Sequence, residues 1–273
     1  MRPTARLFTA SVLALIAGPA ISHTALSDAN VLAIHDRLLP IDSHVDIGSG
    51  YGTKRLDPGV INDAQVDLPS MRIGGLDAGF FVVYTPQGAL TEEGYAEALL
   101  AAEEGYRGIQ RMLRANPDQI GLATTADEVE ALNAEGKLVA LIGIENAYPL
   151  GSTPEEVAES LPLWANRGAT YVSLTHFGHN QFGGSSNPSS ARGEGEDPGL
   201  PELGRALIEA LHRDGVMVDV SHVGPQTTAD AIAASRVPVI ASHSTVAAVH
   251  DNPRGQTDAQ LDAIRDRGRV AQL

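Results

Sequence analysis

The sequence predicts an α/β protein of the (β/α)8 TIM-type barrel, with about six to seven of the eight strands present. Three observations lead to this fold class. Short apolar runs alternate with amphipathic segments along nearly the whole chain. Several runs are apolar at almost every position, which is typical of parallel strands covered by helices. Most of the runs also end in a histidine or a carboxylate, as barrel strands do at a catalytic rim.

Six apolar runs before residue 250 are predicted strands, because each has strand length and is followed by turn residues or a helical segment. They are 38–47 (LLPIDSHVDI), 79–85 (GFFVVYT), 138–146 (LVALIGIEN), 170–176 (TYVSLTH), 215–222 (GVMVDVSH) and 237–243 (VPVIASH). The segment RVAQL at the end of the chain begins a seventh strand.

The segments between the strands have helical periodicity and helix-boundary residues. One predicted helix starts at Pro154, after a Ser152 or Thr153 cap, and ends at Gly168. The other predicted helices cover 91–115, 201–214, 225–235 and 257–268. The irregular stretch 178–199 is rich in Gly, Ser and Asn, and in this architecture we expect it to cover the active site.

The N-terminus has the layout of a secretory signal peptide. Two arginines come before an apolar run at 7–20, and small residues then lead to a cleavage site after Ser22. We therefore expect residues 1–22 to be removed and residues 23–273 to form the barrel domain, in a periplasm or outside the cell. We expect no transmembrane helix in the mature chain, since no later stretch is apolar enough.

Composition argues against several classes of function. The formal net charge is −15, so no basic surface for nucleic acid is expected. The chain has no cysteine, which excludes disulfides and thiolate metal ligands. No serine-centred nucleophile elbow is present, which disfavours a serine hydrolase.

Histidines and carboxylates stand near the ends of five of the six predicted strands. They are His44, Asp46, Glu145, His176, His222 and His243. In a parallel barrel these ends meet on one rim, and two residues separated by one position point to the same side. Imidazoles with carboxylates suit zinc, and also tolerate cobalt or manganese. Five of the six residues, all but His176, are enough for two ions if Glu145 bridges them.

Five segments carry a family resemblance. They are IDSHVD, GIENAYPLG, YVSLTHFGHNQFGGSS, VDVSHVG and VPVIASHSTVAAVHDNPRG. Together they span nearly the whole mature chain, and in their order and spacing they resemble the membrane dipeptidase (renal dipeptidase) family of zinc peptidases. The resemblance implies that His44 and Asp46 hold one Zn²⁺, that His222 and His243 hold a second, and that Glu145 bridges the two.

The same resemblance implies a reaction. His176 would contact the substrate and stabilise the developing oxyanion, as a rim donor can. Arg254 would bind the substrate carboxylate, which a guanidinium fork fits geometrically. The implied substrate is a dipeptide, often with a D-residue at the C-terminal position, attacked by a water that bridges the metals. Family members are also often homodimers.

The resemblance breaks at the last residues of the chain. The family's barrel continues with two more strands and a late aspartate that acts in proton transfer, whereas this chain ends at GRVAQL. We therefore assign no general acid or base, and expect an isolated 273-residue product to be unstable and weakly active or inactive. Two alternatives stay open: another metal-dependent amidohydrolase acting on cyclic amides or esters, and an inactive truncated metal-binding remnant.

Overall fold

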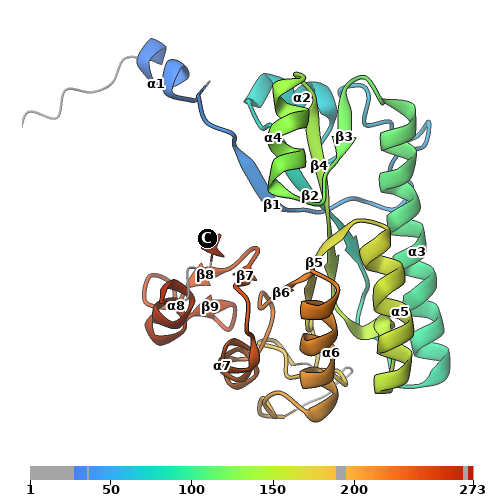
Figure 1. Cartoon of the computed structure of the whole chain (residues 1–273), viewed down its shortest axis with the longest axis vertical. Helices are drawn as coiled ribbons and strands as arrows, with labels where there is room; N and C mark the ends of the chain where they lie inside the picture. Colours follow the sequence, from blue (N-terminus) through green and yellow to red (C-terminus); the bar gives the residue numbers. More distant parts are fainter. Residues whose placement is uncertain (1–27, 36, 189–194, 267–269, 273) are drawn as a thin grey trace, which may run out of the picture. The chain divides into compact units, whose positions relative to one another are not determined.

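The computed structural model describes residues 28–35, 37–188, 195–266 and 270–272. The chain divides into two units between Arg37 and Leu38. The described part of the first unit contains helix α1 (Asp28–His35), and the second unit holds all the other elements labelled in Figure 1. The predicted signal peptide, residues 1–22, lies outside the described residues.

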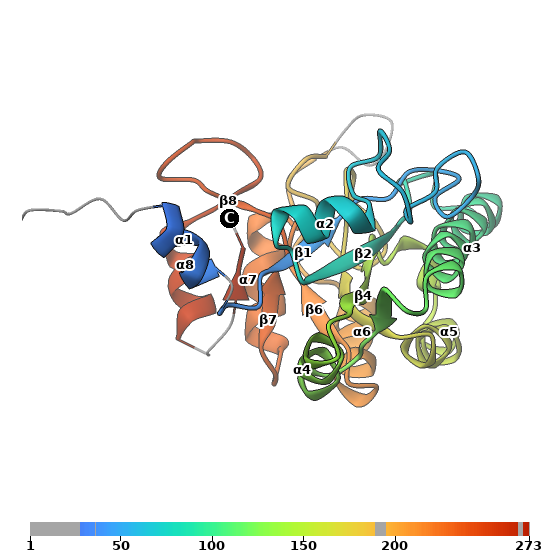
Figure 2. The same ribbon diagram turned by 90° about the horizontal axis from the view of Figure 1, so that it is seen from above.

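An eight-stranded parallel sheet organises the second unit. Its order is β1 (Ile41–Val45), β2 (Ala78–Tyr84), β4 (Leu138–Glu145), β5 (Ala169–Ser173), β6 (Met217–Asp219), β7 (Val239–Ala241) and β10 (Val270–Ala271), with the short β3 (Ile120–Leu122) paired to the start of β4. Viewed from above, the sheet curls into an open half-barrel (Figure 2). The predicted incomplete (β/α) barrel is therefore confirmed, with a strand at each of the seven predicted places.

The observed strands are shorter than the predicted ones toward the end of the sheet. Strands β6 and β7 pair over three residues each, inside the predicted runs 215–222 and 237–243. Strand β6 ends at Asp219, and the chain then turns through His222, which has a left-handed backbone with φ 64°. The sequence predicts longer strands because the apolar pattern of these runs continues past the point where the backbone turns.

The helices that were expected are present. They are α3 (Glu92–Ala115), α5 (Pro154–Asn166), α6 (Glu202–Arg213), α7 (Pro225–Ala234) and α8 (Asp258–Arg265). Of the two expected cap residues of α5, Thr153 is the one that accepts the backbone N–H of Glu156. Such a cap contributes about 1 kcal/mol to helix stability.

Several short elements were not predicted. They are α2 (Leu68–Gly74), β3, α4 (Ala126–Ala134), the one-turn η1 (Tyr148–Leu150), and the two-stranded sheet of β8 (Thr245–Val246) and β9 (Gly255–Gln256). Helix α4 is closed at its start by a reciprocal capping box between Thr125 and Glu128. That pattern is visible in the sequence, but a three-residue strand followed by a nine-residue helix gives too little periodicity to predict.

The two faces of the sheet differ in what they bury. Along β2 and β4, Phe81 and Ile142 belong to the main apolar core, which includes buried residues of α3, α5 and α6. The intervening residues Phe80 and Leu141 face the interior of the half-barrel, in a smaller apolar cluster. Glu145 lies on this inner face as well, four residues beyond Leu141. The interior therefore changes from apolar to polar toward the C-terminal ends of the strands.

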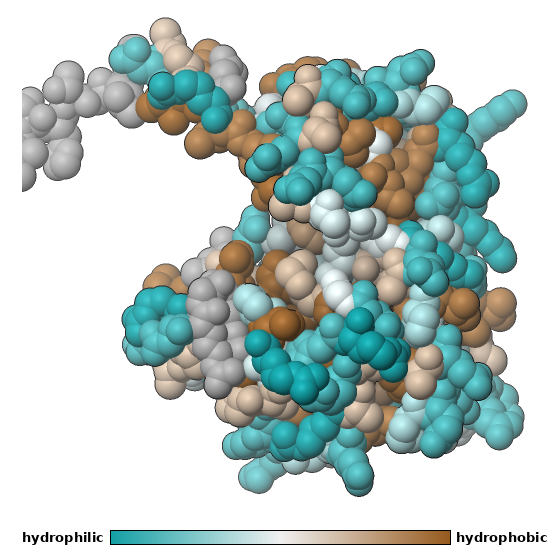
Figure 3. All heavy atoms as spheres, in the orientation of Figure 1, coloured by the Kyte–Doolittle hydropathy of each residue, from teal (hydrophilic) through white to brown (hydrophobic). Residues whose placement is uncertain are grey.

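Figure 3 shows hydrophilic side chains along most of the visible face, and apolar side chains that reach the surface between α4 and α3.

Part of the irregular segment 178–199 is described. Asp197 fastens it to the start of α7 by accepting the backbone N–H groups of Gln226 and Thr227, at 2.7 and 2.9 Å. A role for this segment as a cover stays a prediction.

Candidate metal centre

The predicted metal ligands and His176 come from the C-terminal ends of strands. His44 is the fourth residue of β1, and Glu145 is the last residue of β4. The other histidines lie two or three residues beyond β5, β6 and β7: His176, His222 and His243. A parallel sheet brings all these ends to one edge, which is how residues about 200 positions apart become neighbours.

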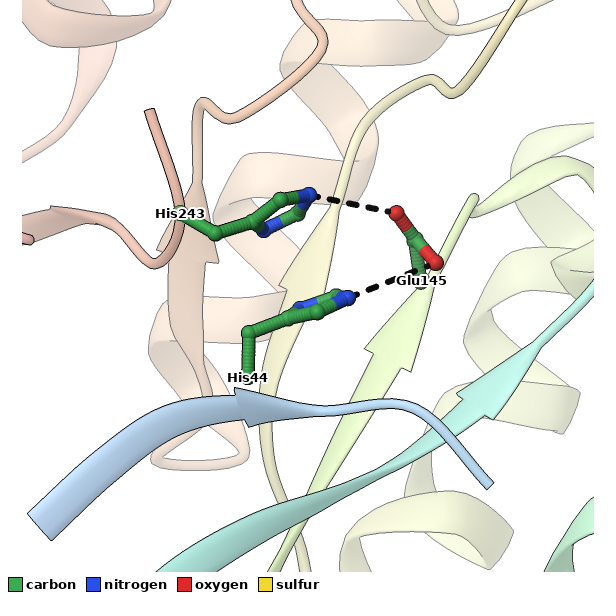
Figure 4. A group of neighbouring side chains, drawn as sticks. All are labelled: His44, Glu145 and His243. Atoms are coloured by element: carbon green, nitrogen blue, oxygen red, sulfur yellow. Dashed lines mark ion pairs between the residues drawn. The ribbon is translucent and has the colours of Figure 1, made fainter. Parts of the chain in front are cut away.

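The Glu145 carboxylate lies at the centre of the group. Its Oε1 is 3.1 Å from Nε2 of His222, 3.5 Å from Nε2 of His243 and 3.6 Å from Nε2 of His176. Its Oε2 is 3.6 Å from Nε2 of His44. Figure 4 shows two of the rings, His44 and His243, directed at this carboxylate from opposite segments of the chain. The side chain of Glu145 is 4% exposed, so the charge is almost fully enclosed.

Asp46 and Arg254 lie at the edge of the group. Oδ1 of Asp46 is 3.6 Å from Nε2 of His44, and its side chain is 69% exposed. Arg254 is held by a hydrogen bond of 2.9 Å from Nη2 to the backbone oxygen of His243. Its Nη1 is buried and has no hydrogen-bond partner among the described residues. The structure thus places every residue of the predicted site within or beside one cluster.

Two residues of the site have strained backbones. Among the described residues, Asn146 (φ 77°) and His222 (φ 64°) are the non-glycine residues with positive φ. Asn146 directly follows Glu145, and its side chain donates to Thr85 O and Gln87 Oε1 and accepts from Asn180. Such conformations cost on the order of 1–3 kcal/mol and persist where surrounding contacts enforce them, as at functional sites.

The protonation of the group is set by burial and by Glu145. Burial alone would raise the pKa of Glu145, but hydrogen bonds from the surrounding imidazoles outweigh it and lower the pKa. Burial lowers the pKa of His222 to about 3 and also lowers that of His176. Burial would lower the pKa of His44 as well, yet the carboxylates of Asp46 and Glu145 raise it to about 9. The site therefore holds one firmly ionised carboxylate and at least two neutral imidazoles.

These donors fit a metal centre. Two triads have ligand atoms within 4.8 Å of one another: His44, Glu145 and His243, and Glu145, His176 and His222. In addition, Nε2 of His222 lies 2.8 Å from Nε2 of His243. Two imidazole nitrogens face each other favourably at this distance when a proton or a cation lies between them. Neutral nitrogen and carboxylate oxygen donors are the ligands that zinc accepts in the absence of thiolates.

Three buried residues behind the ligands were not singled out in the sequence. The Tyr171 hydroxyl is 3.1 Å from Nδ1 of His44, and the Ser242 hydroxyl is 2.9 Å from Nδ1 of His243. Asp219 accepts the Ser242 hydroxyl at 2.7 Å. The sequence offered two signals for them. Alternation along the strands places Asp219 and Tyr171 on the same inner face as Glu145, and a carboxylate inside the apolar run VMVDV requires a partner.

Comparison with known proteins gives the family. The sequence profile of the membrane dipeptidase family (peptidase family M19) matches residues 28–273. The chain belongs to this family. The predicted resemblance is therefore confirmed, and the chain is a member of a family of metal-dependent dipeptidases.

Individual relatives agree with this assignment. Dipeptidase verJ of Clonostachys rogersoniana is 29% identical over 267 residues, which cover 92% of this chain and 67% of the relative. Dipeptidase ataJ of Aspergillus terreus is 30% identical over 255 residues, covering 84% and 61%. The chain thus spans about two thirds or less of the length of these relatives.

Solved structures of similar fold include two peptidases. The probable dipeptidase PvdM from Pseudomonas aeruginosa superposes with a TM-score of 0.82 at 29% identity, covering 89% of this chain and 62% of that one. A metallopeptidase from Rhodobacter sphaeroides, bound to a phosphinate mimic of the dipeptide L-Ala-D-Ala, gives a TM-score of 0.69 at 25% identity, covering 86% and 73%.

The remaining predictions concern membrane insertion, export and assembly of the protein. Within residues 28–35, 37–188, 195–266 and 270–272, no helix combines the length and the apolarity needed to cross a bilayer. Export, the signal peptide and the homodimer stay predictions.

Proposed function

We propose that this chain carries the metal centre of a zinc-dependent dipeptidase that hydrolyses the peptide bond of dipeptides, including those with a D-residue at the C-terminal position. One observation carries the proposal: a buried carboxylate, Glu145, has four imidazole nitrogens within 3.1–3.6 Å. Such a set is expensive to bury without a cation, and family membership supplies the reaction.

The distribution of atoms supports two ions rather than one. Oε2 of Glu145 points to His44, beside which Asp46 lies, and Oε1 points to His222 and His243. The proposed assignment follows: His44 and Asp46 hold one Zn²⁺, His222 and His243 hold the other, and Glu145 bridges them. When bound, such a pair acidifies a shared water and polarises the carbonyl under attack.

The other residues act on the substrate. A neutral His176 has one ring N–H to donate to the oxyanion that forms on the peptide carbonyl. Its burial, which lowers its pKa, supports this neutral form. Arg254 would bind the substrate carboxylate. The unpartnered Nη1 supports this role, because a buried donor without an acceptor is unfavourable and a carboxylate would satisfy it.

The test is hydrolysis by the zinc-loaded chain. L-Ala-L-Ala and L-Ala-D-Ala are incubated with the protein, and free alanine is measured by chromatography, alongside zinc content by mass spectrometry. We expect two zinc ions per chain and a weak hydrolysis, in keeping with the missing late aspartate, that stops on chelation and returns with zinc. Glu145→Gln should abolish hydrolysis, whereas Glu159→Gln, on the exposed side of α5, should leave it unchanged.

The same assay separates the alternatives. Turnover of hydantoins or lactones, with none of the dipeptides, would identify a different metal-dependent amidohydrolase. Two bound zinc ions without turnover of any substrate would identify a metal-binding remnant. Protein that folds but binds no zinc would refute the metal assignment itself.

A further inference from the structure

Beneath the candidate ligands lies a layer of polar groups that is fully enclosed. Tyr171 and Asp219 are 0% exposed and Ser242 is 1% exposed. They come from β5, from the end of β6 and from the residue after β7, and Ser242 lies beside the Tyr171 hydroxyl. Polar groups buried this deeply require partners, so the direction of each of their hydrogen bonds can be worked out.

Tyr171 reaches across the half-barrel to the first strand. Its ring passes over Gly143 of β4, where a Cβ atom would overlap the ring. Its hydroxyl donates to the backbone oxygen of Ser43 at 3.1 Å and lies 3.1 Å from Nδ1 of His44. Because the single hydroxyl proton is directed to a carbonyl, the second contact requires that Nδ1 of His44 be the donor.

Ser242 makes the equivalent contact to the other ring. Its hydroxyl donates to Oδ2 of Asp219 at 2.7 Å, and its oxygen lies 2.9 Å from Nδ1 of His243. A carboxylate only accepts, so the serine proton is directed to it and Nδ1 of His243 must be the donor. Oδ1 of Asp219 accepts the backbone N–H groups of Ser221 and Ser242, each at 3.0 Å, which fixes the orientation of the carboxylate.

We propose that Tyr171 and the Asp219–Ser242 pair are positioning residues that keep the proton of His44 and His243 on Nδ1 and so direct both Nε2 lone pairs to the metal side. The inference rests on the proposed metal centre and adds residues that touch neither metal nor substrate. It applies to these two rings, because Nδ1 of His176 and of His222 is buried and has no hydrogen-bond partner in the part of the chain that the structure describes.

The first test measures zinc affinity by competition with a chromophoric chelator. Tyr171→Phe keeps the ring over Gly143 but removes the acceptor for His44, and Ser242→Ala removes the acceptor for His243. Each should weaken binding of zinc about 10–100-fold, the usual effect of losing a partner of a metal-bound histidine. The matched control is Thr170→Val, in which the adjacent buried hydroxyl loses its 2.8 Å bond to Ile142 O. That variant should retain the wild-type zinc affinity.

The second test inverts the hydrogen bonds. In Asp219→Asn the side-chain amide donates to the Ser242 oxygen, and the serine proton is then redirected to Nδ1 of His243. The imidazole proton must move to Nε2, where a ligand lone pair is needed. In zinc-free protein with ¹⁵N-labelled histidine rings, we expect the proton of His243 on Nδ1 in the wild type and on Nε2 in the variant. Zinc affinity should fall at least as far as in Ser242→Ala.

The outcomes separate a positioning role from a structural one. Equal zinc affinity in Tyr171→Phe, Ser242→Ala and Thr170→Val would overturn the inference, as would an unchanged His243 proton in Asp219→Asn. If Asp219→Asn does not fold, the hydroxyl variants decide alone, with the unfolding temperature of the zinc-free proteins as the measure of structural damage. A wild-type protein that binds no zinc would instead refute the proposed function.

Discussion

The four imidazoles around Glu145 form two pairs with different supports. His44 and His243 stack with ring centroids 3.6 Å apart, and Nδ1 of each contacts a buried hydroxyl. His176 and His222 have centroids 4.2 Å apart, and their buried Nδ1 atoms find no hydrogen-bond partner among the described residues. The first pair is oriented before anything binds, whereas burial keeps the second pair neutral. Histidines at equivalent strand ends can therefore be made ready for metal binding in different ways, by hydrogen bonds in one pair and by burial in the other.

Glu145→Gln is expected to have the largest effect, because it removes the charge shared by both pairs. Removing one partner from a buried ionic group costs about 3–5 kcal/mol, so zinc affinity should fall by at least two orders of magnitude. The amide retains the volume of the side chain, which makes zinc binding by equilibrium dialysis a direct readout. Two zinc ions bound with wild-type affinity would show that Glu145 is not the bridge.

His176→Ala should separate the pairs. Under the proposed assignment His176 contacts substrate rather than metal, so the variant should keep two zinc ions while kcat falls about 10²–10³-fold, as expected on loss of an oxyanion donor. His243→Ala should instead lose zinc. The proximity of His176 to Glu145 and His222 allows the opposite result. If His176→Ala loses zinc to the same extent as His243→Ala, then His176 is a ligand.

Arg254 lies beside the second pair, where its charge contributes to the low pKa of His222 and of His176. Arg254→Ala should raise KM for dipeptides about ten- to hundredfold, the value of a charged hydrogen bond of about 1.5–3 kcal/mol, with zinc content unchanged. Arg254→Lys should recover part of the loss, since an ammonium supplies charge without the guanidinium fork. A change in kcat with KM constant would place Arg254 outside carboxylate binding.

The sequence predicted the candidate metal ligands better than the buried residues that hold them in place. Imidazoles and carboxylates at strand ends are rare enough to be recognised, and strand geometry brings those ends together. Tyr171 lies in the run TYVSL, where a tyrosine looks like an ordinary core residue, and nothing in a linear pattern shows that its hydroxyl spans two strands to reach His44. The serine before His243 is equally inconspicuous. Their roles depend on distances across the half-barrel, which spacing along the chain does not encode.

The fold shows the same division. The six strands that lie in apolar runs of seven or more residues were predicted, as were helices such as α3 and α6, which have long amphipathic periods. The three-residue β3 and the helix α4 that follows it were not predicted. Strand β3 pairs with the start of β4, whose other edge pairs with β2, and this pairing across the sheet is not visible in the sequence. Short elements of this kind are stabilised by tertiary packing rather than by their own periodicity.

The pH dependence of zinc affinity provides the smallest and most selective comparison of the pairs. His44, with a pKa of about 9, is protonated at pH 7 and must release the Nε2 proton to bind zinc. The affinity that depends on His44 should therefore rise about tenfold per pH unit between pH 6 and 8. His222, with a pKa of about 3, is neutral throughout that range and adds no slope.

Calorimetry in buffers of different ionisation enthalpy tests this difference. At pH 7 one zinc ion should release about one proton more than the other, and His44→Ala should remove that excess. Because Nδ1 of His44 already contacts Tyr171, the released proton is the one on Nε2, so the orientation of the ring is unchanged by binding. Equal proton release for both ions would mean that His44 loses no proton when zinc binds, which would contradict its raised pKa.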